Sequence, residues 1–325
     1  MTRTATARQE RTAAVFDSDV WPLLPERAAR LILAGLDGLP TRGMKLALEV
    51  GCATGGLSLE VARRLGAGAR LIALDESPAL IARAESRRDA RQVARDRRPG
   101  GKGSPDRPEA PGEKDITGTR VSFQVGELRP PFPAADGTCD LAYSNLALAE
   151  SLSTAAAHGT SPRTPSSEPP ADAARAGLGQ LASCLAPGGA LLATFPVEGC
   201  WREFLDLYAD VLAAQGRRET LAALEKYRRA FPSPAALVTA LERTGLVDVT
   251  VETARWELLF RSAREFFFAP VVELGPLAEW QQIAGGRGDE MQDLFFFVKE
   301  AIDTYFARTP FGVSLVVCCV KGRRP

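Results

Sequence analysis

The segment Leu46–Leu65 constrains the fold of this chain more than any other part of its sequence. It starts with a short apolar run, which predicts a strand, and it ends in a stretch with apolar residues at helical spacing. Between them, the small residues Gly51, Ala53 and Gly55 let the backbone turn tightly and approach a ligand. The helix N-terminus adds unpaired N–H groups and a positive dipole end. The segment therefore predicts a ligand site at a strand–loop–helix turn.

An acidic residue, Glu49, precedes this loop by two positions. A dinucleotide-binding loop has the spacing G-x-G-x-x-G, which suits a pyrophosphate. Here the spacing is G-x-A-x-G, with Cys52 as its second residue, and the Glu49 carboxylate would repel a pyrophosphate. The loop therefore disfavours a nicotinamide dinucleotide and favours a cofactor that carries an amino group.

A second acidic position, Asp75, ends the next predicted strand, Leu71–Leu74, and Glu76 follows it. A carboxylate at such a strand end can accept hydrogen bonds from ribose hydroxyls. The alternative is that Asp75 or Ser77 only caps the helix that begins at Pro78. Because Asp75 occurs together with the loop, we favour the ribose role.

Strands and helices alternate along the chain, which predicts a parallel sheet with right-handed crossovers. The other predicted strands are Val121–Val125, Asp140–Ser144, Ala190–Phe195, Val247–Thr253 and Gly312–Val320. The other predicted helices are Trp21–Leu36, Ala173–Leu185, Trp201–Gln215, Arg218–Ala230 and Pro234–Thr244. We expect a single domain over residues 1–325, with N-terminal cap helices over about 15–40.

Two stretches interrupt this plan, at about 96–118 and about 151–171. They contain few large apolar residues, so we expect disordered surface insertions there. A third stretch, about 262–308, is an aromatic helical insertion before the last strand. Its aromatic residues could form a helical core, line a substrate pocket or form a partner surface, and we favour the core.

The composition excludes several classes of protein. A formal net charge of zero gives no overall footprint for nucleic acid, and the arginine-rich range 83–107 also contains acidic residues. Six cysteines without a CxxC pair, and one histidine, exclude a structural zinc site. No apolar run approaches the ~20 residues of a membrane span. We expect a cytoplasmic protein with reduced cysteines, no metal and no membrane partner.

With these motifs in place, the chain resembles the class I S-adenosylmethionine-dependent methyltransferases, in particular the small-molecule type 11 group. The resemblance spans roughly Val20–Pro196. Its motifs are, in order, the loop Glu49–Gly55, the strand end at Asp75, and the segments Val125–Pro133, Thr138–Leu148 and Leu185–Leu192. It implies an α/β, Rossmann-like fold: a seven-stranded, mostly parallel sheet of order 3-2-1-4-5-7-6, helices on both faces and a helical lid. It also implies S-adenosyl-L-methionine as the cofactor.

The resemblance assigns roles to single residues. The backbone of Gly51, Ala53 and Gly55 would pack against the methionine part and the ribose, and Glu49 would orient the amino group. Asp75 would bind the ribose, Glu127 the adenine amino group, and Asn145 would contact the methionine end. The N–H of Leu128 would also face the adenine, and Cys52 and Glu76 complete the expected contacts. Two departures are Ala53, where glycine is commoner, and Glu127, where aspartate is usual.

We expect the N-terminal helix and the C-terminal helical block to form the acceptor pocket, with Asp17, Trp21 and Tyr143 as candidate residues. The alternative is that Trp21 packs the helix onto the sheet and Asp17 caps it. No catalytic residue is assigned, because a sulfonium methyl group needs mainly in-line placement of a nucleophile. A base helps only if the nucleophile must lose a proton. The sole histidine, His158, is expected to be an exposed loop residue.

The predicted function is methyl transfer to a small molecule or to a carrier-bound acid. One alternative is a non-catalytic partner or scaffold protein of the same fold; the intact loop and Asp75 disfavour it. The other is an RNA methyltransferase. The sequence Ser144–Ala147 stands where base-amino methyltransferases have Asn-Pro-Pro-aromatic, which disfavours it. The acceptor atom and the oligomeric state are left open.

Overall fold

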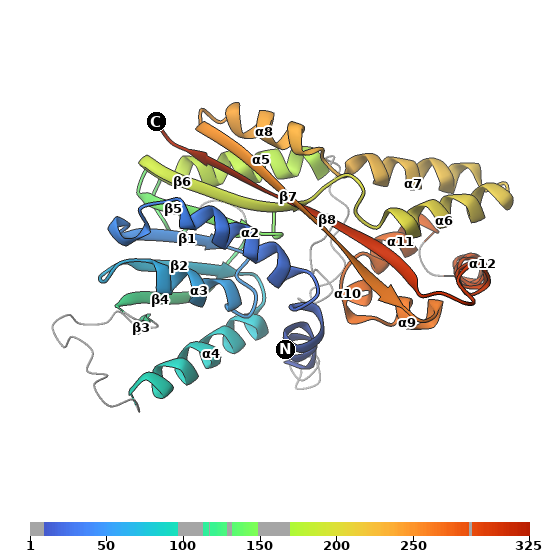
Figure 1. Ribbon diagram of the computed structural model, residues 1–325, viewed down its shortest axis with the longest axis horizontal. Helices are drawn as coiled ribbons and strands as arrows, with labels where there is room; N and C mark the ends of the chain where they lie inside the picture. The colour runs from blue at the N-terminus through green and yellow to red at the C-terminus, as the bar shows by residue number, and fades with distance from the viewer. Residues whose placement is uncertain (1–9, 97–112, 117, 129–131, 149–169, 286–287) are drawn as a thin grey trace.

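A computed structural model describes residues 10–96, 113–116, 118–128, 132–148, 170–285 and 288–325. Its centre is an eight-stranded sheet of order β3-β4-β2-β1-β5-β6-β8-β7 (Figure 1). The strands are β1 Leu46–Val50, β2 Arg70–Asp75, β3 Glu113–Ile116, β4 Thr119–Val125, β5 Cys139–Asn145, β6 Leu185–Pro196, β7 Val247–Phe260 and β8 Phe311–Arg323. The helices are η1 Phe16–Val20, α2 Pro25–Asp37, η2 Thr41–Gly43, α3 Gly56–Arg64, α4 Pro78–Asp96, α5 Pro170–Cys184, α6 Arg202–Ala214, α7 Arg218–Ala230, α8 Pro234–Glu242, α9 Ala263–Phe267, α10 Pro270–Glu273, α11 Leu277–Ile283 and α12 Asp289–Tyr305.

The strand order confirms the predicted topology. Without the edge strand β3, the remaining strands, numbered along the chain, have the order 3-2-1-4-5-7-6. Strands β4, β2, β1, β5 and β6 are parallel, and β8 is antiparallel to both of its neighbours. The predicted number of strands was too small by one. Strand β3 pairs with β4 in a range where no element was expected, because its residues are mostly charged and lack an apolar alternation. Most of the two expected insertions, residues 97–112 and 149–169, lies outside the described residues.

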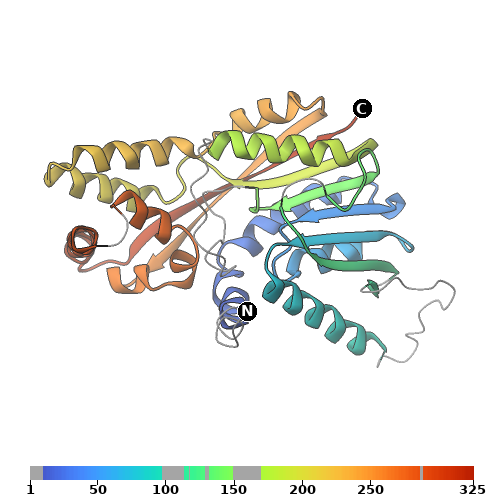
Figure 2. The same cartoon turned by 180° about the vertical axis from the view of Figure 1, so that it is seen from behind.

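Two apolar layers bury the sheet, one on each face (Figures 1 and 2). Helices α2, α3 and α4 cover one face, and α5 and α8 cover the other. Strands covered on both faces become continuous apolar runs, which explains why β1 and β2 were readable in the sequence. In β8, Cys318 belongs to one layer and Cys319 to the other, because successive side chains of a strand point to opposite faces.

The N-terminal helix begins later than the sequence suggested. The prediction placed its start at Trp21, whereas α2 starts at Pro25. Proline favours the first helical position, and Pro25 takes it here. The residues before it form the short π-helix η1, with Phe16 and Val20 buried. This break turns the chain so that η1 projects away from the sheet toward α10, against which it packs (Figure 1).

Strands β7 and β8 are longer than predicted and extend past the end of the parallel strands (Figure 1). Helices α6, α7 and α9–α12 gather around this extension. Their core is aromatic: Phe204 stacks on Trp280 with ring centroids 4.1 Å apart, and Phe266 lies 5.0 Å from Phe204. The aromatic residues of 262–308 thus form a core, as favoured, although Phe268 and Phe296 are exposed.

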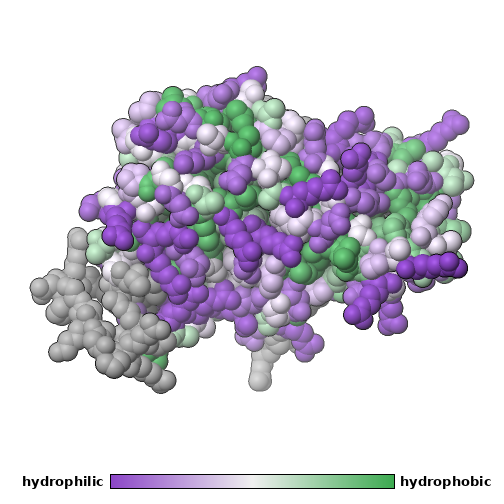
Figure 3. All heavy atoms as spheres, viewed as in Figure 1, coloured by the Kyte–Doolittle hydropathy of each residue, from purple (hydrophilic) through white to green (hydrophobic). Residues whose placement is uncertain are grey.

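None of the helices that the structure describes combines the length and apolarity that crossing a bilayer requires. On the face shown in Figure 3, hydrophilic residues cover much of the surface and apolar residues form separate areas.

Candidate active site

The loop between β1 and α3 contains three residues in the left-handed backbone conformation. Gly51, Ala53 and Gly55 have φ angles of +82°, +47° and +72°. The N–H groups of Gly51 and Cys52 both donate to the carbonyl oxygen of Leu74, at 2.8 Å. The loop is therefore tied to the end of β2. Ala53 adopts a backbone conformation that costs an L-residue roughly 1–2 kcal/mol.

Close packing explains two of the glycines. A Cβ on Gly51 would lie 2.0 Å from the Cβ of Ala147, two residues after the end of β5. A Cβ on Gly56, the first residue of α3, would lie 2.6 Å from the ring of Trp21. The loop thus lies between the end of β5 and the N-terminal segment, with no room for a side chain at either position.

Asp75, at the end of β2, is buried and holds the loop. Its Oδ2 accepts a hydrogen bond from the N–H of Ala53 at 2.8 Å, and its Oδ1 accepts one from Ser77 at 3.0 Å. The cap of α4 is Ser77, whose Oγ accepts from the N–H of Leu80 at 3.3 Å. The helix therefore has its own cap, while the Asp75 carboxylate lines the cavity described below.

Glu49, the fourth residue of β1, is 1% exposed. Its Oε2 accepts a hydrogen bond from the hydroxyl of Tyr143 on β5, at 3.0 Å. Burial raises the pKa of Glu49 to about 7, although the hydroxyls of Ser58 and Tyr143 oppose this shift; the nearby Asp75 adds to it. Glu49 is thus a buried carboxyl group that titrates near neutral pH.

These residues surround a cavity at the carboxyl ends of the parallel strands, where open α/β sheets bind their ligands. Three parts of the chain line it. The N-terminal segment supplies Phe16, Val20, Trp21, Leu24 and Pro25. The strand ends, the segments that follow them and the first turn of α3 supply Glu49, Gly51, Cys52, Ala53, Leu57, Asp75, Leu128, Asn145, Leu146 and Ala147. Helix α10 and the turn after it supply Val271, Leu274, Gly275 and Pro276. The described lining residues include two carboxyl groups and no lysine or arginine.

The remaining predicted cofactor contacts lie at and near this cavity. Asn145 lines it; its amide donates to the carbonyl of Pro25 at 2.9 Å, and its oxygen accepts from Thr194 at 2.8 Å. Leu128 also lines it, and its N–H donates to Glu76 at 3.3 Å. Glu127 is exposed and does not belong to the lining. The adenine role of Glu127 stays a prediction.

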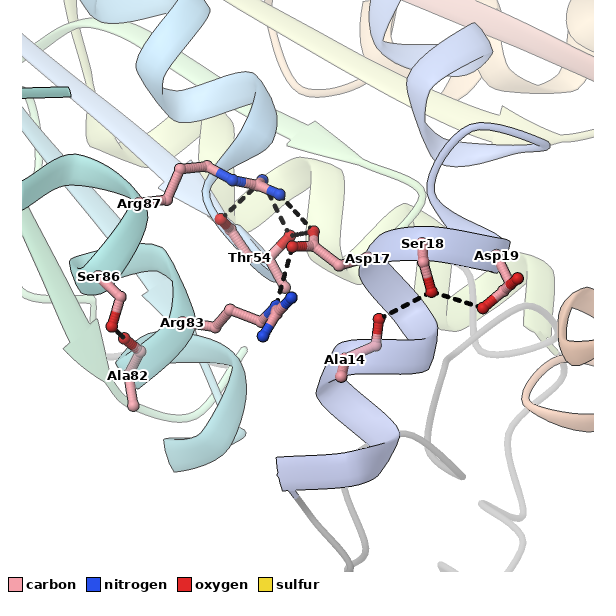
Figure 4. Close-up of polar contacts among 9 residues, drawn as sticks. All are labelled: Ala14, Asp17, Ser18, Asp19, Thr54, Ala82, Arg83, Ser86 and Arg87. Atoms are coloured by element: carbon pink, nitrogen blue, oxygen red, sulfur yellow. Dashed lines mark hydrogen bonds and ion pairs between the residues drawn. The ribbon is translucent and has the colours of Figure 1, made fainter. Parts of the chain in front are cut away.

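Asp17 anchors the N-terminal segment beside the loop (Figure 4). Its carboxylate accepts hydrogen bonds from Arg83 at 2.9 Å, from Arg87 at 2.5 Å and from the hydroxyl of Thr54 at 2.6 Å. Partial burial opposes ionisation, but hydrogen bonds from Thr54 and Arg83 and the charge of Arg87 hold the pKa of Asp17 below its ordinary value. The carboxylate thus joins η1 to α4 and to the loop.

The three candidate pocket residues have different places. Trp21 lines the cavity, whereas Asp17 and Tyr143 are not among its lining residues. Tyr143 lies behind Glu49, and Asp17 forms the ion pairs with α4. Val271 and Leu274 come from the C-terminal helical block, which was expected to contribute to the pocket, but no local pattern distinguishes these two apolar residues from core residues.

Other predicted features concern metals, histidine and the arginines of α4. Among the residues described, no group of histidine, cysteine and acidic side chains is arranged to hold a metal ion. His158 lies outside the described residues.

The arginines of α4 have internal partners: Arg88 is 3% exposed and donates to the carbonyl of Val121, and Arg91 pairs with Glu60. These contacts weaken the argument for an RNA-binding face on this helix.

Comparisons with known proteins add a short sequence match. No family model matches the chain. Carboxy-S-adenosyl-L-methionine synthase from Wolinella succinogenes is 40% identical over 82 residues, which cover 24% of this chain and 34% of that protein. The chain therefore matches about a third of the length of this curated relative.

Solved structures match over most of the chain at low identity. The YcgJ protein from Bacillus subtilis is 11% identical, with a TM-score of 0.47, over 92% of this chain and 98% of that one. Phosphoethanolamine N-methyltransferase 2 from Haemonchus contortus is 13% identical, with a TM-score of 0.44, over 92% of this chain and 52% of that one. The strand order, with its antiparallel β8 inserted between β6 and β7, gives this chain the Rossmann-like fold of the class I S-adenosylmethionine-dependent methyltransferases.

Proposed function

We propose that the chain binds S-adenosyl-L-methionine in this cavity and transfers its methyl group to a small molecule. The observation that carries the proposal is the pair of buried carboxyl groups, Glu49 and Asp75, at neighbouring strand ends in one cavity. A buried carboxylate is costly unless a partner compensates it. An ammonium group at Glu49 and ribose hydroxyls at Asp75 are partners of the required kind.

The matched relative supports the choice of cofactor. Its name describes an enzyme that makes carboxy-S-adenosyl-L-methionine, and 40% of 82 aligned residues are identical to this chain. The match covers a minor part of both proteins. It therefore supports the choice of cofactor only, and the acceptor has to be inferred from the chemistry of the cavity.

The reaction needs little acid–base chemistry from the protein. S-adenosyl-L-methionine, when bound, would supply a methyl group already activated by its sulfonium; a nucleophile would take the methyl carbon, and the C–S electron pair would stay on sulfur. Glu49 would hold the amino group of the cofactor, and Asp75 would hold its ribose hydroxyls. Trp21, Leu274 and their apolar neighbours exclude water and fix the acceptor, and placement of this kind can account for much of the barrier reduction.

The lining favours a small acceptor with an apolar body over a carrier-bound acid. The walls contributed by the N-terminal segment and the α10 turn are apolar, and the described lining contains no cation that would pair with an acid. An acidic acceptor would find no cationic side chain among the described lining residues, and only the sulfonium of the cofactor would oppose its charge. A cytosolic location remains a prediction.

Isothermal titration calorimetry on the full chain tests the proposal. We expect saturable one-site binding of S-adenosyl-L-methionine and of S-adenosyl-L-homocysteine. NAD is the control ligand, and it should not bind, because the two carboxyl groups repel its pyrophosphate. Absence of binding at millimolar cofactor would contradict the proposal and favour the non-catalytic partner.

A further inference from the structure

Tyr143 and Glu49 are paired by the sheet itself. They are Cα partners in the parallel ladder between β5 and β1, so their side chains stand on the same face. The Tyr143 hydroxyl lies 3.0 Å from Oε2 of Glu49, and the two residues are 0% and 1% exposed. Glu49 lines the cavity and Tyr143 does not, so Tyr143 contacts the carboxyl group from behind.

The hydroxyl serves as a donor in this pair. Burial, and the negative charge of Glu49, raise the pKa of Tyr143 well above its ordinary value, so the phenol keeps its proton. A donated hydrogen bond stabilises the ionised form of a carboxyl group relative to the neutral form. Tyr143 thus favours the carboxylate at a position where burial favours the acid.

We propose that Tyr143 is a positioning residue that holds the Glu49 carboxylate in place, and ionised, for the ammonium group of the cofactor. This role rests on the proposed function, because it requires a cationic amino group at Glu49. Tyr143 itself touches neither the cofactor nor the reacting atoms.

The other groups around Glu49 set the direction of the pH dependence. Asp75 on β2 disfavours a second negative charge, and Ser58 on α3 opposes that effect. Cys52 in the loop stays neutral, because burial raises its pKa well above the ordinary value. Since the pKa of Glu49 is about 7, an ammonium ligand gains affinity as the pH rises through this value. Without the Tyr143 hydroxyl, the pKa of Glu49 would be higher, so the same gain in ligand affinity would occur at a higher pH.

Two ligands that differ only in their amino-acid part test this role. S-adenosyl-L-homocysteine carries the ammonium group, and 5′-methylthioadenosine lacks the amino-acid part but keeps the adenosine and a neutral thioether. We expect Tyr143→Phe to weaken the binding of the first ligand roughly tenfold at pH 7. The binding of the second should stay within about twofold. The pH midpoint of the homocysteine affinity should move upward in the variant.

The matched control is Tyr208→Phe, which removes the hydroxyl of another buried tyrosine, in the helical block, that donates to the carbonyl of Trp280. This control should change neither affinity. A double-mutant cycle distinguishes the positioning role from a general loss of stability. In a Glu49→Gln background, Tyr143→Phe should leave the ratio of the affinities for S-adenosyl-L-homocysteine and 5′-methylthioadenosine unchanged.

Equal weakening of both ligands by Tyr143→Phe, or an unshifted pH midpoint, would overturn the positioning role and leave the proposed function intact. If the wild-type chain binds neither ligand, the proposed function fails, and the role of Tyr143 fails with it.

Discussion

Gly51 in the loop and Ala147, two residues after the end of β5, are in such close contact that a Cβ added to Gly51 would lie 2.0 Å from the Cβ of Ala147. This contact joins the first strand–helix turn to the fourth parallel strand of the sheet, and both residues line the cavity. The loop is thereby held between β2, through Leu74, and β5.

The clash predicts the outcome of Gly51→Ala. The variant should lose more than about 2 kcal/mol of unfolding free energy, because steric overlap adds to the left-handed backbone strain. It should also lose cofactor binding. Gly68→Ala is the matched control, since Gly68 has the same φ of +82° but nothing within 4 Å of an added Cβ. Chemical denaturation of both variants measures the difference. Equal destabilisation would show that the contact with Ala147 adds nothing.

Asp75→Ala should weaken the binding of S-adenosyl-L-homocysteine by roughly 1.5–3 kcal/mol, the range for hydrogen bonds to a charged group. The Asp75→Ala variant also loses the hydrogen bond that the Asp75 carboxylate accepts from the N–H of Ala53. Ser77→Ala is the control: it removes the cap of α4, which costs about 1 kcal/mol of stability, and leaves the cavity unchanged. Titration calorimetry gives both affinities. Wild-type affinity in Asp75→Ala would mean that Asp75 only organises the backbone.

Asp17→Asn should loosen the N-terminal segment from α4. The pairs with Arg83 and Arg87 are partly exposed, so the expected loss is about 1 kcal/mol. Because the pKa of Asp17 is lowered on folding, its contribution is complete above the ordinary value of 3.8 and disappears as the pH falls through the folded value. Hydrogen exchange of residues 10–24 should accelerate in this variant at neutral pH. Asp19→Asn, an exposed change on the same turn, should not accelerate it.

Glu49→Gln should stabilise the chain at alkaline pH while it weakens the binding of the ammonium ligand. The pKa of Glu49 rises from 4.5 to about 7 on folding, so the folded state holds more protons and wild-type stability falls between these pH values. This difference in pKa corresponds to about 3 kcal/mol of unfolding free energy. Unfolding at pH 5 and pH 8 measures it. Exposed Glu219→Gln is the control. A variant that gains nothing at pH 8 would contradict the buried ionisation.

The sequence predicted those features that depend on local pattern. Glu49, the loop and Asp75 follow each other within one strand–helix–strand unit, and their positions relative to the sheet follow from strand direction alone. Local pattern also explains the start of α8, where Ser233 precedes Pro234 and its side chain accepts the N–H of Ala236.

The features that were missed depend on contacts between distant segments. The bond from Tyr143 to Glu49 joins residues 94 positions apart, and its register is fixed by the packing of β5 on β1. The pairs of Asp17 with Arg83 and Arg87 join η1 to α4. Leu274 reaches the cavity only because the long strands β7 and β8 place α10 beside η1. No local periodicity encodes such distances.

A crystal structure of the full chain with S-adenosyl-L-homocysteine would show whether the two buried carboxyl groups bind the cofactor. We predict that the ribose hydroxyls lie within hydrogen-bond distance of Asp75, and that the amino group lies beside Glu49, with Trp21 and Leu274 around the sulfur end. A ligand bound elsewhere, or one in this cavity without contact to either carboxyl group, would contradict it.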